Sequence, residues 1–314
     1  MNVLSLFDGL SCGQMALERA GIKVDKYYAS EIKPHAIKVT QHNYPNTIQL
    51  GDVTKVTKDM VSDVKLLIGG SPCQDLSAGN RERLGLAGLK SSLFYQYLRI
   101  LEEVKPQFFL LENVIMDWEH SMTITNLLKT RPCRINSSLL SAQLRDRLYW
   151  TNIGPEDFDL FGNRECTIPQ PEDKGITLQS ILESGWTDMP KSRCLLESDS
   201  RPLANPYNMF HRYYSTGFTT VVFKDEATFE EMKAAYKKTL DEDGNRSLPY
   251  DLEVFAKGRI RYLSQTELEK LQTVPQNYTS ILNRNDAACL LGDGWTCDVI
   301  SHIFSFLPEE YKKR

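Results

Sequence analysis

The chain has 314 residues, of which 41% are hydrophobic, 25% charged and 10% aromatic, and its net charge is −4 at pH 7. This length suits one large or two modest domains, and the composition is that of a globular rather than a disordered protein. The negative net charge favours no polyanionic partner for the chain as a whole, so any binding of nucleic acid must depend on local basic patches.

No apolar run reaches the length of about 18 residues that a membrane-spanning helix needs, so we expect no membrane partner. The 7 cysteines are odd in number and include no C-x-x-C pair, which argues against a disulfide framework and against a thiolate zinc site. The 5 histidines show no ligand spacing, so we expect no metal. The first residues show no basic region or cleavage site, which predicts a cytoplasmic setting.

The first half of the chain alternates short apolar runs with helical patterns. Such alternation predicts an α/β fold with a doubly wound, mostly parallel sheet, whose polar groups gather at the carboxyl ends of the strands. The expected strands are 3–7, 24–31, 48–53, 66–68 and 108–111, and the expected helices are 13–20, 34–43 and 93–104.

This pattern changes after Gly154. Residues 155–258 hold many prolines, tyrosines and acidic residues and show no steady period, apart from a helical pattern at 226–240. Helical periodicity then returns at 266–271, 280–291 and 296–307. We therefore expect one domain made of residues 1–154 and 259–314, and a second, smaller domain of residues 155–258 inserted in it.

A glycine-bearing turn, FDGLSCG at residues 7–13, lies between the first strand and the first helix, where backbone amides can hold a negative group. Its spacing is not G-x-G-x-x-G, so a nucleoside ligand such as S-adenosylmethionine is favoured over a dinucleotide. Glu31 stands near the end of the second expected strand, and Asp52 ends the third. There, carboxylates can accept hydrogen bonds from ribose hydroxyls and from an adenine amino group.

Cys73, in the sequence GSPCQ, is the most informative cysteine. A thiol that follows a proline at the mouth of a parallel sheet lies on a loop, where helix ends and cations favour the reactive thiolate. The alternative is a small buried hydrophobic residue, the usual role of a free cysteine. The polar segment 76–92 after it carries Arg81 and Arg83, which suits a lid over an anionic substrate.

Two further groups of polar residues follow. Glu112, in the sequence ENV, ends another apolar strand, and neighbouring strand ends converge, so it can face the same cavity as Cys73. In QLRDRLYW, residues 143–150, the alternation predicts Gln143, Arg145 and Arg147 on one face of a strand. These groups need an anionic or hydrogen-bonding partner, or else an internal pairing with acids.

In this order, the sequences FDGLSCG, GSPCQ, ENV, QLRDRLYW and GDGWTCDVISHI resemble the DNA (cytosine-5) methyltransferases. The resemblance covers roughly residues 1–154 and 259–307. The opening FDG and the tryptophan of GDGW are similar to the animal de novo methyltransferases, whereas the length suits a compact bacterial or phage enzyme acting in the cytoplasm. The chain departs from many relatives at Ser11, where they carry glycine, and at Asp293-Gly294, where asparagine-serine is commoner.

The resemblance implies an enzyme that flips a cytosine out of duplex DNA and methylates its carbon 5 from S-adenosylmethionine. Cys73 then adds to carbon 6, Glu112 acts at ring nitrogen 3, and Arg145 and Arg147 hold the base carbonyl and a phosphate. The implied cofactor contacts are Phe7, Asp8, Gly9, Cys12, Gly13, Glu31, Ile32, Asp52, Val53, Pro72, Leu93, Asn113, Gly294 and Trp295. The expected substrate contacts are Gln74, Ser77, Arg81, Arg83, Gln143, Arg201 and Arg212.

Target recognition is expected in the unmatched residues 155–258. Between residues 189 and 223, Lys191, Arg193, Arg201 and Arg212 stand against two acids, with aromatic residues interleaved, as DNA contact requires. Three alternatives stay open: a related enzyme that methylates tRNA cytosine, a catalytically silent nucleic-acid-binding or accessory protein of the same fold, and, more distantly, a dinucleotide oxidoreductase.

Overall fold

The computed structural model describes residues 1–72, 93–239 and 253–313. The chain forms two compact units. The first comprises Met1–Ser137, Asp146–Glu172 and Gly294–Arg314, and the second comprises Ser138–Arg145 and Asp173–Asp293. Residues 155–172, expected in the insertion, therefore belong to the first unit, and residues 259–293 belong to the second. The roles of the two units as catalytic and recognition domains stay a prediction.

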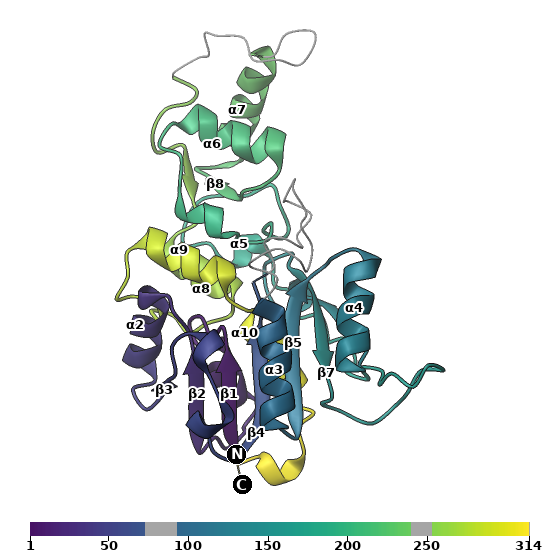
Figure 1. Ribbon diagram of the computed structural model, residues 1–314. Coiled ribbons are helices and arrows are strands. Elements are labelled where there is room, and N and C mark those ends of the chain that lie inside the picture. The colour runs from purple at the N-terminus through teal and green to yellow at the C-terminus, as the bar shows by residue number, and fades with distance from the viewer. Residues whose placement is uncertain (73–92, 240–252, 314) are drawn as a thin grey trace. The chain divides into compact units, whose positions relative to one another are not determined.

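A seven-stranded sheet forms the centre of the first unit, in the strand order β3-β2-β1-β4-β5-β7-β6 (Figure 1). The strands are β1 (Asn2–Leu6), β2 (Lys26–Ser30), β3 (Ile48–Gln49), β4 (Val64–Gly70), β5 (Phe108–Val114), β6 (Cys133–Asn136) and β7 (Asp146–Thr151). Strands β3 to β5 pair in parallel, whereas β7 is antiparallel to both of its neighbours. The predicted doubly wound, mostly parallel sheet is confirmed.

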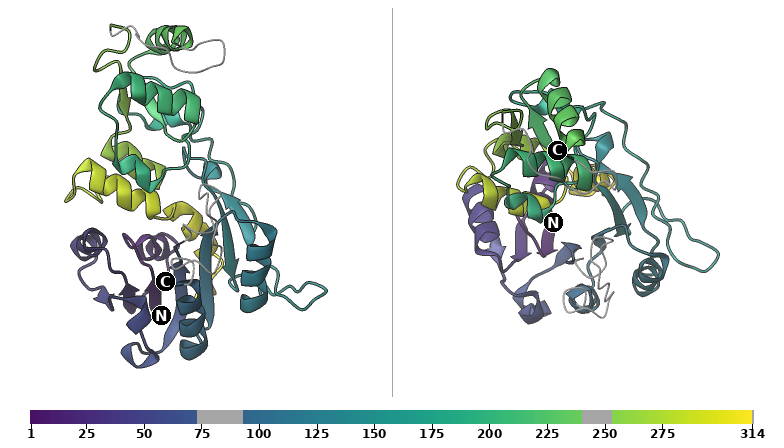
Figure 2. Two further views of the ribbon diagram at one scale, coloured as in Figure 1. Left: turned by 45° about the horizontal axis from the view of Figure 1, so that its top comes forward. Right: turned by 90° about the horizontal axis from the view of Figure 1, so that it is seen from above.

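Helices cover this sheet. They are α1 (Cys12–Arg19), α2 (Pro34–Asn43), α3 (Phe94–Val104), α4 (Trp118–Leu128) and α10 (Cys297–Phe304), with short turns η1 (Val53–Lys55), η2 (Lys58–Met60) and η8 (Glu309–Tyr311). The turn η5 (Ser137–Leu139) begins in the first unit, and its other two residues belong to the second. Figure 2 shows α3 and α4 on the same side of the sheet. Their buried face includes Phe94 and Tyr97, and the fully buried Trp150 donates its indole N–H to Thr125 of α4. Predicted helices 13–20, 34–43 and 93–104 agree with α1, α2 and α3 to within one residue at each end.

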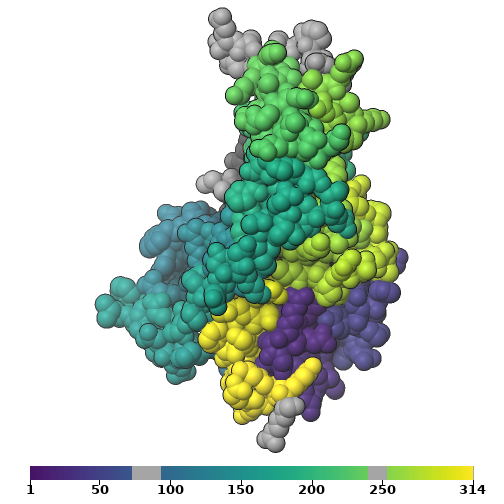
Figure 3. Space-filling view, turned by 180° about the vertical axis from the view of Figure 1, so that it is seen from behind, coloured from purple at the N-terminus to yellow at the C-terminus, as the bar shows by residue number. Residues whose placement is uncertain are grey.

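The C-terminal residues complete the first unit. Helix α10 packs against α1, and Ile22 forms a bridge with Lys312. Figure 3 shows the yellow C-terminal residues lying against the purple N-terminal segment. Chain segments almost 300 residues apart thus share one core.

The second unit combines short helices with a two-stranded antiparallel sheet. Its elements are α5 (Leu178–Ile181), η6 (Glu197–Ser200), α6 (Pro206–His211), η7 (Arg212–Thr216), β8 (Val221–Phe223), α7 (Glu226–Lys238), β9 (Ile260–Tyr262), α8 (Gln265–Leu271) and α9 (Arg284–Asp293). Seven aromatic side chains form most of one core: Tyr207, Phe210, Tyr213, Phe223, Phe229, Tyr236 and Phe255. Most aromatics expected between residues 189 and 223 are therefore buried rather than available to a ligand.

Gly13 marks a close contact beneath the first helix. A Cβ at this position would overlap the Cδ1 of Ile68 and lie 2.8 Å from the hydroxyl of Tyr27. We expect Gly13→Ala to lower the free energy of unfolding by about 2 kcal/mol, measured by chemical denaturation. The double variant Gly13→Ala/Ile68→Val lacks the overlapping methyl group, so it should lose less than the sum of the two single variants. Strict additivity would contradict the contact.

Candidate active site

Glu112 is the centre of the site in the first unit. Strand pairing places Gly70 of β4, Glu112 of β5 and Tyr149 of β7 in one row across the sheet. Glu112 is only 8% exposed, and its Oε1 lies 3.1 Å from Nε of Arg147. Its Oε2 accepts a hydrogen bond of 3.0 Å from the indole N–H of Trp295. The structure thus brings together three of the residues predicted from the sequence.

Gly70 makes room for this arrangement. A Cβ on Gly70 would lie 2.8 Å from the indole nitrogen of Trp295 and 2.9 Å from Oε2 of Glu112. Any larger residue here would force Trp295 and Glu112 apart. The chain continues from Gly70 through Ser71 and the half-buried Pro72 toward Cys73, and Asn113 donates from Nδ2 to the Ser71 hydroxyl at 3.2 Å. Asn113 therefore ties the end of β5 to the segment that precedes Cys73.

The predicted site residues Cys73, Gln74, Ser77, Arg81 and Arg83 lie outside the described residues. The predicted proximity of Cys73 to Glu112 therefore stays a prediction. Leu93, the first described residue after position 72, is half-buried.

The expectation that Gln143, Arg145 and Arg147 share a strand face is wrong, because β7 begins only at Asp146. Arg145 is buried in the second unit, where its guanidinium donates to the carbonyl oxygens of Leu195 and Gly292, both at 3.1 Å. Gln143, also in the second unit, accepts from the backbone N–H of Leu195 at 2.7 Å and donates to the carbonyl of Leu271 at 3.2 Å. These two side chains link segments of the second unit. The catalytic role of Arg145 and the substrate contact of Gln143 stay predictions.

The glycine-bearing turn after β1 has an unusual backbone. Phe7, Gly9 and Ser11 have positive φ angles of 57°, 59° and 62°. A left-handed conformation costs a non-glycine residue about 1–2 kcal/mol, which explains why glycine suits the position of Ser11. The backbone N–H of Gly9 donates to Oε2 of Glu31 at 2.8 Å. Glu31, the residue after β2, therefore supports the turn, a contact that the sequence pattern did not indicate.

Asp8 faces the protein interior beneath this turn. Its Oδ1 accepts a hydrogen bond of 2.8 Å from the hydroxyl of Tyr27, itself a buried residue of β2. Burial raises the pKa of Asp8 to about 6, and the nearby charge of Glu31 acts in the same direction. Burial also raises the pKa of the Tyr27 phenol. Asp8 therefore links the turn to β2 through its hydrogen bond with Tyr27.

The rim of the predicted cofactor site includes acids and an exposed apolar residue. Oε1 of Glu31 accepts from the backbone N–H groups of Ile32 at 2.7 Å and Lys33 at 2.8 Å. Asp52 caps η1 through Oδ1, which accepts from the backbone and hydroxyl of Thr54, both at 2.9 Å, and these bonds lower the pKa of Asp52. Ile32 is 70% exposed, whereas Val53 is buried.

The basic residues expected to contact DNA have different surroundings in the second unit. Nζ of Lys191 donates to the carbonyls of Ser138, Ser141 and Ile176, and Arg193 donates to backbone carbonyls at Tyr213 and Thr219. Their donors thus stabilise the unit itself. Arg201 is exposed, and Arg212 donates to the Ser198 hydroxyl at 3.1 Å. Both keep their predicted role as substrate contacts.

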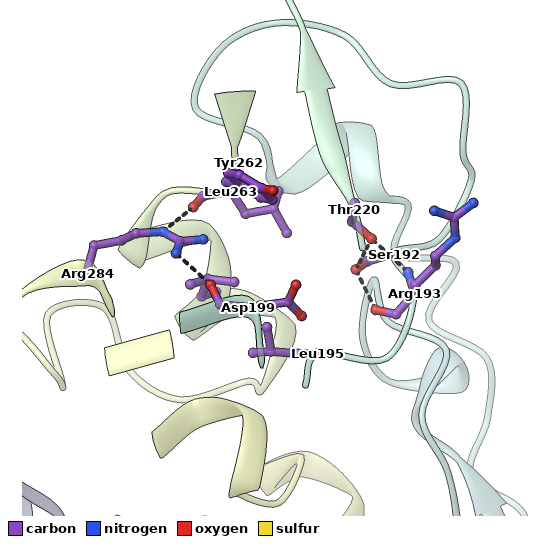
Figure 4. A pocket seen from close by; sticks show the side chains of 9 residues that line it. Ser192, Arg193, Leu195, Asp199, Thr220, Tyr262, Leu263 and Arg284 are labelled. Atoms are coloured by element: carbon purple, nitrogen blue, oxygen red, sulfur yellow. Dashed lines mark hydrogen bonds between the residues drawn. The ribbon is translucent and has the colours of Figure 1, made fainter. Parts of the chain in front are cut away.

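A small polar cavity in the second unit is shown in Figure 4. Its volume of about 10 Å³ holds no more than one water molecule. Arg284 donates to the carbonyls of Leu263 at 3.1 Å and Asp199 at 2.8 Å, and burial lowers the pKa of this arginine. The hydrogen bonds of Arg284 hold these chain segments together, and the cavity is too small for a cofactor.

The described ranges, 1–72, 93–239 and 253–313, contain no group of three or more His, Cys, Asp or Glu residues that could hold a metal ion. Within the same ranges, no helix has the length and apolar character needed to cross a membrane.

The sheet topology defines an α/β protein with a mostly parallel sheet and a polar site at its carboxyl edge. The model of the family described as C-5 cytosine-specific DNA methylase matches residues 1–308, and the chain belongs to this family. The fold is similar to the crystal structure of S. pombe Dnmt2 methyltransferase, with a TM-score of 0.65, 18% identity and 97% of each chain covered. A DNMT2 mutant of Spodoptera frugiperda has a TM-score of 0.66, 18% identity and coverage of 96% of this chain and 97% of that one.

Similar sequences come from bacteria and their phages. Orphan methyltransferase M.SPRI of Bacillus phage SPR is 33% identical over 182 residues, which are 54% of this chain and 40% of that protein. Type II methyltransferase M.NgoBV of Neisseria gonorrhoeae is 32% identical over 204 residues, covering 58% and 46%. Type II methyltransferase M1.ScrFI of Lactococcus lactis subsp. cremoris is 26% identical over 325 residues, covering 99% and 79%. The matches thus span less than half the length of the first two relatives.

The raised pKa of Asp8 predicts a pH-dependent stability. Because the pKa rises from 3.8 to about 6 on folding, the folded state binds this proton more tightly, and the stabilisation is complete below about pH 4. It is lost as the pH rises through 6, by an amount of order 3 kcal/mol. Asp8→Asn keeps the acceptor for Tyr27 and cannot ionise. Its free energy of unfolding, relative to that of the wild type, should therefore increase between pH 4 and pH 8.

Chemical denaturation of both proteins across this pH range measures the difference. Asp59→Asn, at an exposed position, is the matched control and should follow the wild type. Parallel pH profiles for Asp8→Asn and the wild type would contradict the burial of an ionisable carboxyl at this position.

Proposed function

We propose that this protein transfers a methyl group from S-adenosylmethionine to carbon 5 of cytosine in duplex DNA. The observation that carries the proposal is the pairing of the buried Glu112 with Arg147 at the end of β5, beside the strand whose end leads to Cys73. Family membership supports the same chemistry. Because the related sequences are bacterial and phage proteins, the proposed setting is the cytoplasm of a bacterial or phage-infected cell.

The chain's own residues supply the activation of the base. Carbon 5 of cytosine is a poor nucleophile, since the ring is aromatic and electron-poor. In the proposed reaction, the Cys73 thiolate forms a bond with carbon 6, and the ring electrons shift toward carbon 5. Glu112 shares a proton with ring nitrogen 3 and so offsets the negative charge that develops there. The bond to carbon 6 breaks when a base removes the proton from carbon 5.

In the proposed reaction, Arg147 positions Glu112 and the base. Its Nε contacts Glu112, and Nη1 donates to the carbonyl of Asp146 at 2.8 Å, so the guanidinium is held from two sides. A guanidinium presents five N–H donors in a fixed plane, which suits it to hold the base carbonyl and the carboxylate together. The reacting atoms are hidden in a duplex, so the target nucleotide must swing out, at a cost of a few kcal/mol that pocket contacts recover.

S-adenosylmethionine supplies the methyl group when it is bound, and several residues fit it. The carboxylate of Glu31, already held by three backbone N–H groups, is oriented to accept from ribose hydroxyls. The exposed side chain of Ile32 offers an apolar surface for the adenine ring. Gly9 leaves open space beside the turn, because nothing lies within 4 Å of where its Cβ would be. Asp52 keeps Oδ2 for the adenine amino group, since Thr54 bonds to Oδ1.

Glu112→Gln tests the proposed acid. The amide keeps the size of the side chain but cannot share a proton with nitrogen 3, so kcat should fall by about 10²–10⁴-fold, measured as tritium transfer from labelled cofactor to duplex DNA. Glu102→Gln makes the same change at an exposed position of α3 and should leave kcat unchanged. Equal rates for the two variants would remove Glu112 from the reaction.

Cys73→Ser tests the covalent step. A hydroxyl is a much weaker nucleophile than a thiolate, so turnover should disappear while binding to duplex DNA is retained. The wild type should also become trapped on DNA that contains 5-fluorocytosine, because the fluorine cannot leave as the proton does. Unchanged turnover in Cys73→Ser would rule out the covalent adduct.

The choice of acceptor is decided by offering duplex DNA and tRNA in parallel and locating the label. Labelled carbon 5 in DNA supports the proposal, whereas label only in tRNA overturns it in favour of a tRNA methyltransferase. Lack of transfer to either acceptor would favour a silent binding protein of the same fold.

A further inference from the structure

Two cysteines lie next to each other at the edge of the sheet in the first unit. Cys133 is the first residue of β6, the outermost strand, and Cys166 belongs to the segment that follows β7. Both are free cysteines, and both are half-buried, so solvent reaches each of them. The proposed methyl transfer uses neither thiol.

Backbone pairing brings the two segments together. Thr130 and Arg164 form a parallel bridge. In it, the N–H of Arg131 donates to the Arg164 carbonyl at 2.7 Å, and the N–H of Arg164 donates to the Lys129 carbonyl at 2.9 Å. Paired strands lie about 4.8 Å apart, and a disulfide joins Cα atoms that are roughly 4.4–6.8 Å apart. The segments therefore run at a spacing that a disulfide can bridge.

The surroundings of the two sulfur atoms differ. The Cys133 thiol donates a hydrogen bond to the sulfur of Cys166, which also accepts from the backbone N–H groups of Cys133 and Ile168. The Cys133 thiol, these N–H groups and the charge of Arg164 lower the pKa of Cys166 to about 7. The same hydrogen bond raises the pKa of Cys133. Cys166 is therefore the nucleophile of the pair, and Cys133 keeps its proton beside it.

These are the features of a thiol that reacts with peroxides. Such a thiol is accessible, largely ionised near pH 7, and adjacent to a second thiol that captures the first product. Cys166 meets the first two conditions, and Cys133 supplies the third. Cys297 of the same unit shows the contrasting case, because it is fully buried and burial raises its pKa well above the usual range.

We propose that Cys133 and Cys166 are a peroxide-reactive pair that closes to a reversible disulfide. The Cys166 thiolate attacks a hydroperoxide, so that an S–O bond forms, the O–O bond breaks, and the leaving oxygen takes up a proton. The Cys133 sulfur then attacks the sulfenic sulfur. The S–S bond forms, and the S–O bond breaks with loss of water, which carries the proton of Cys133. Two thiols are oxidised and one hydroperoxide is reduced, and a thiol reductant reverses the product.

The pair is separate from the site assigned to methyl transfer. Cys133 pairs with Tyr149 of β7, which pairs with Glu112 of β5, so Cys133 lies in the row of Glu112 but two strands away. The disulfide would fasten the segment around Cys166 to the edge strand. Because its formation needs neither cofactor nor nucleic acid, it can be measured independently of the proposed function.

Peptide mapping of the oxidised wild type tests the pair. Trypsin places Cys133 in peptide 130–134 and Cys166 in peptide 165–174, because the Arg131–Pro132 bond resists cleavage. The reduced protein, treated briefly with a small excess of hydrogen peroxide and then alkylated in denaturant, should yield these two peptides joined by a disulfide. Dithiothreitol should separate them. Recovery of both peptides alkylated, or of Cys166 joined to any other cysteine, would refute the proposal.

Cys133→Ser separates the two steps of the reaction. The serine hydroxyl still donates to Cys166 but cannot form a disulfide, so oxidation should stop at the sulfenic acid, which dimedone labels on peptide 165–174. The wild type should carry little of this label. Cys289→Ser, at another half-buried cysteine, is the matched control and should form the joined peptides as the wild type does. Equal dimedone labelling of Cys133→Ser and the wild type would overturn the role of Cys133.

A second measurement on the wild type applies should Cys133→Ser fail to fold. Iodoacetamide reacts with thiolates, so at pH 7 it should alkylate Cys166 of the folded, reduced protein about tenfold faster than Cys289. Mass spectrometry of the two tryptic peptides gives both rates. Alkylation of Cys166 at the rate of Cys289 or below it would refute the reactive thiolate.

Discussion

The antiparallel pairing of β5 with β7 is the constraint on which the site depends. It sets Glu112 opposite Tyr149 and Val114 opposite Arg147, so that Arg147 stands two residues along on the same face of the sheet and reaches the carboxylate. Side chains alternate between faces along a strand, so a shift of one residue in this register would turn Glu112 and Arg147 to opposite faces. The acid would then be buried without its cation.

The burial of Glu112 explains why a change in this register would destabilise the protein. The side chains of Glu112 and Arg147 are 11% and 13% exposed, and a buried charge without a partner destabilises a protein by roughly 3–5 kcal/mol. The pair, the indole N–H of Trp295 and the missing side chain of Gly70 together satisfy both carboxylate oxygens. The sheet thus tolerates an acid in a nearly closed environment, where a shared proton has the greatest effect on a substrate.

The sequence predicts much of the sheet but little of what surrounds its edge. Apolar runs and helical periods identify β1, β4, β5 and the first three helices because these elements are buried and regular. Glu112 lies near the carboxyl end of β5, beside Gly70 of β4, whereas the proximity to Cys73 expected from converging strand ends stays a prediction. The contact between Trp295 and Glu112 joins residues 183 positions apart, and no local pattern encodes such a contact.

Arg145 shows a second limit of sequence reasoning. The alternation in QLRDRLYW suits a strand throughout, yet the strand begins at Asp146, and Arg145 instead binds backbone carbonyls at Leu195 and Gly292. Every residue has a backbone carbonyl, so the pattern of side chains does not show which carbonyls Arg145 binds. The compact units divide at residues 172 and 293, because β9, α8 and α9 pack in the second unit, and a helical period does not show against which unit a helix packs.

The closure of the first unit by α10 has a consequence for how the chain is made. Residues 173–293 form most of the second unit and leave the ribosome before α10 and the bridge from Lys312 to Ile22. The second unit can therefore fold before α10 is available to cover α1. During that interval the face of α1 that α10 covers is exposed to solvent and can promote aggregation.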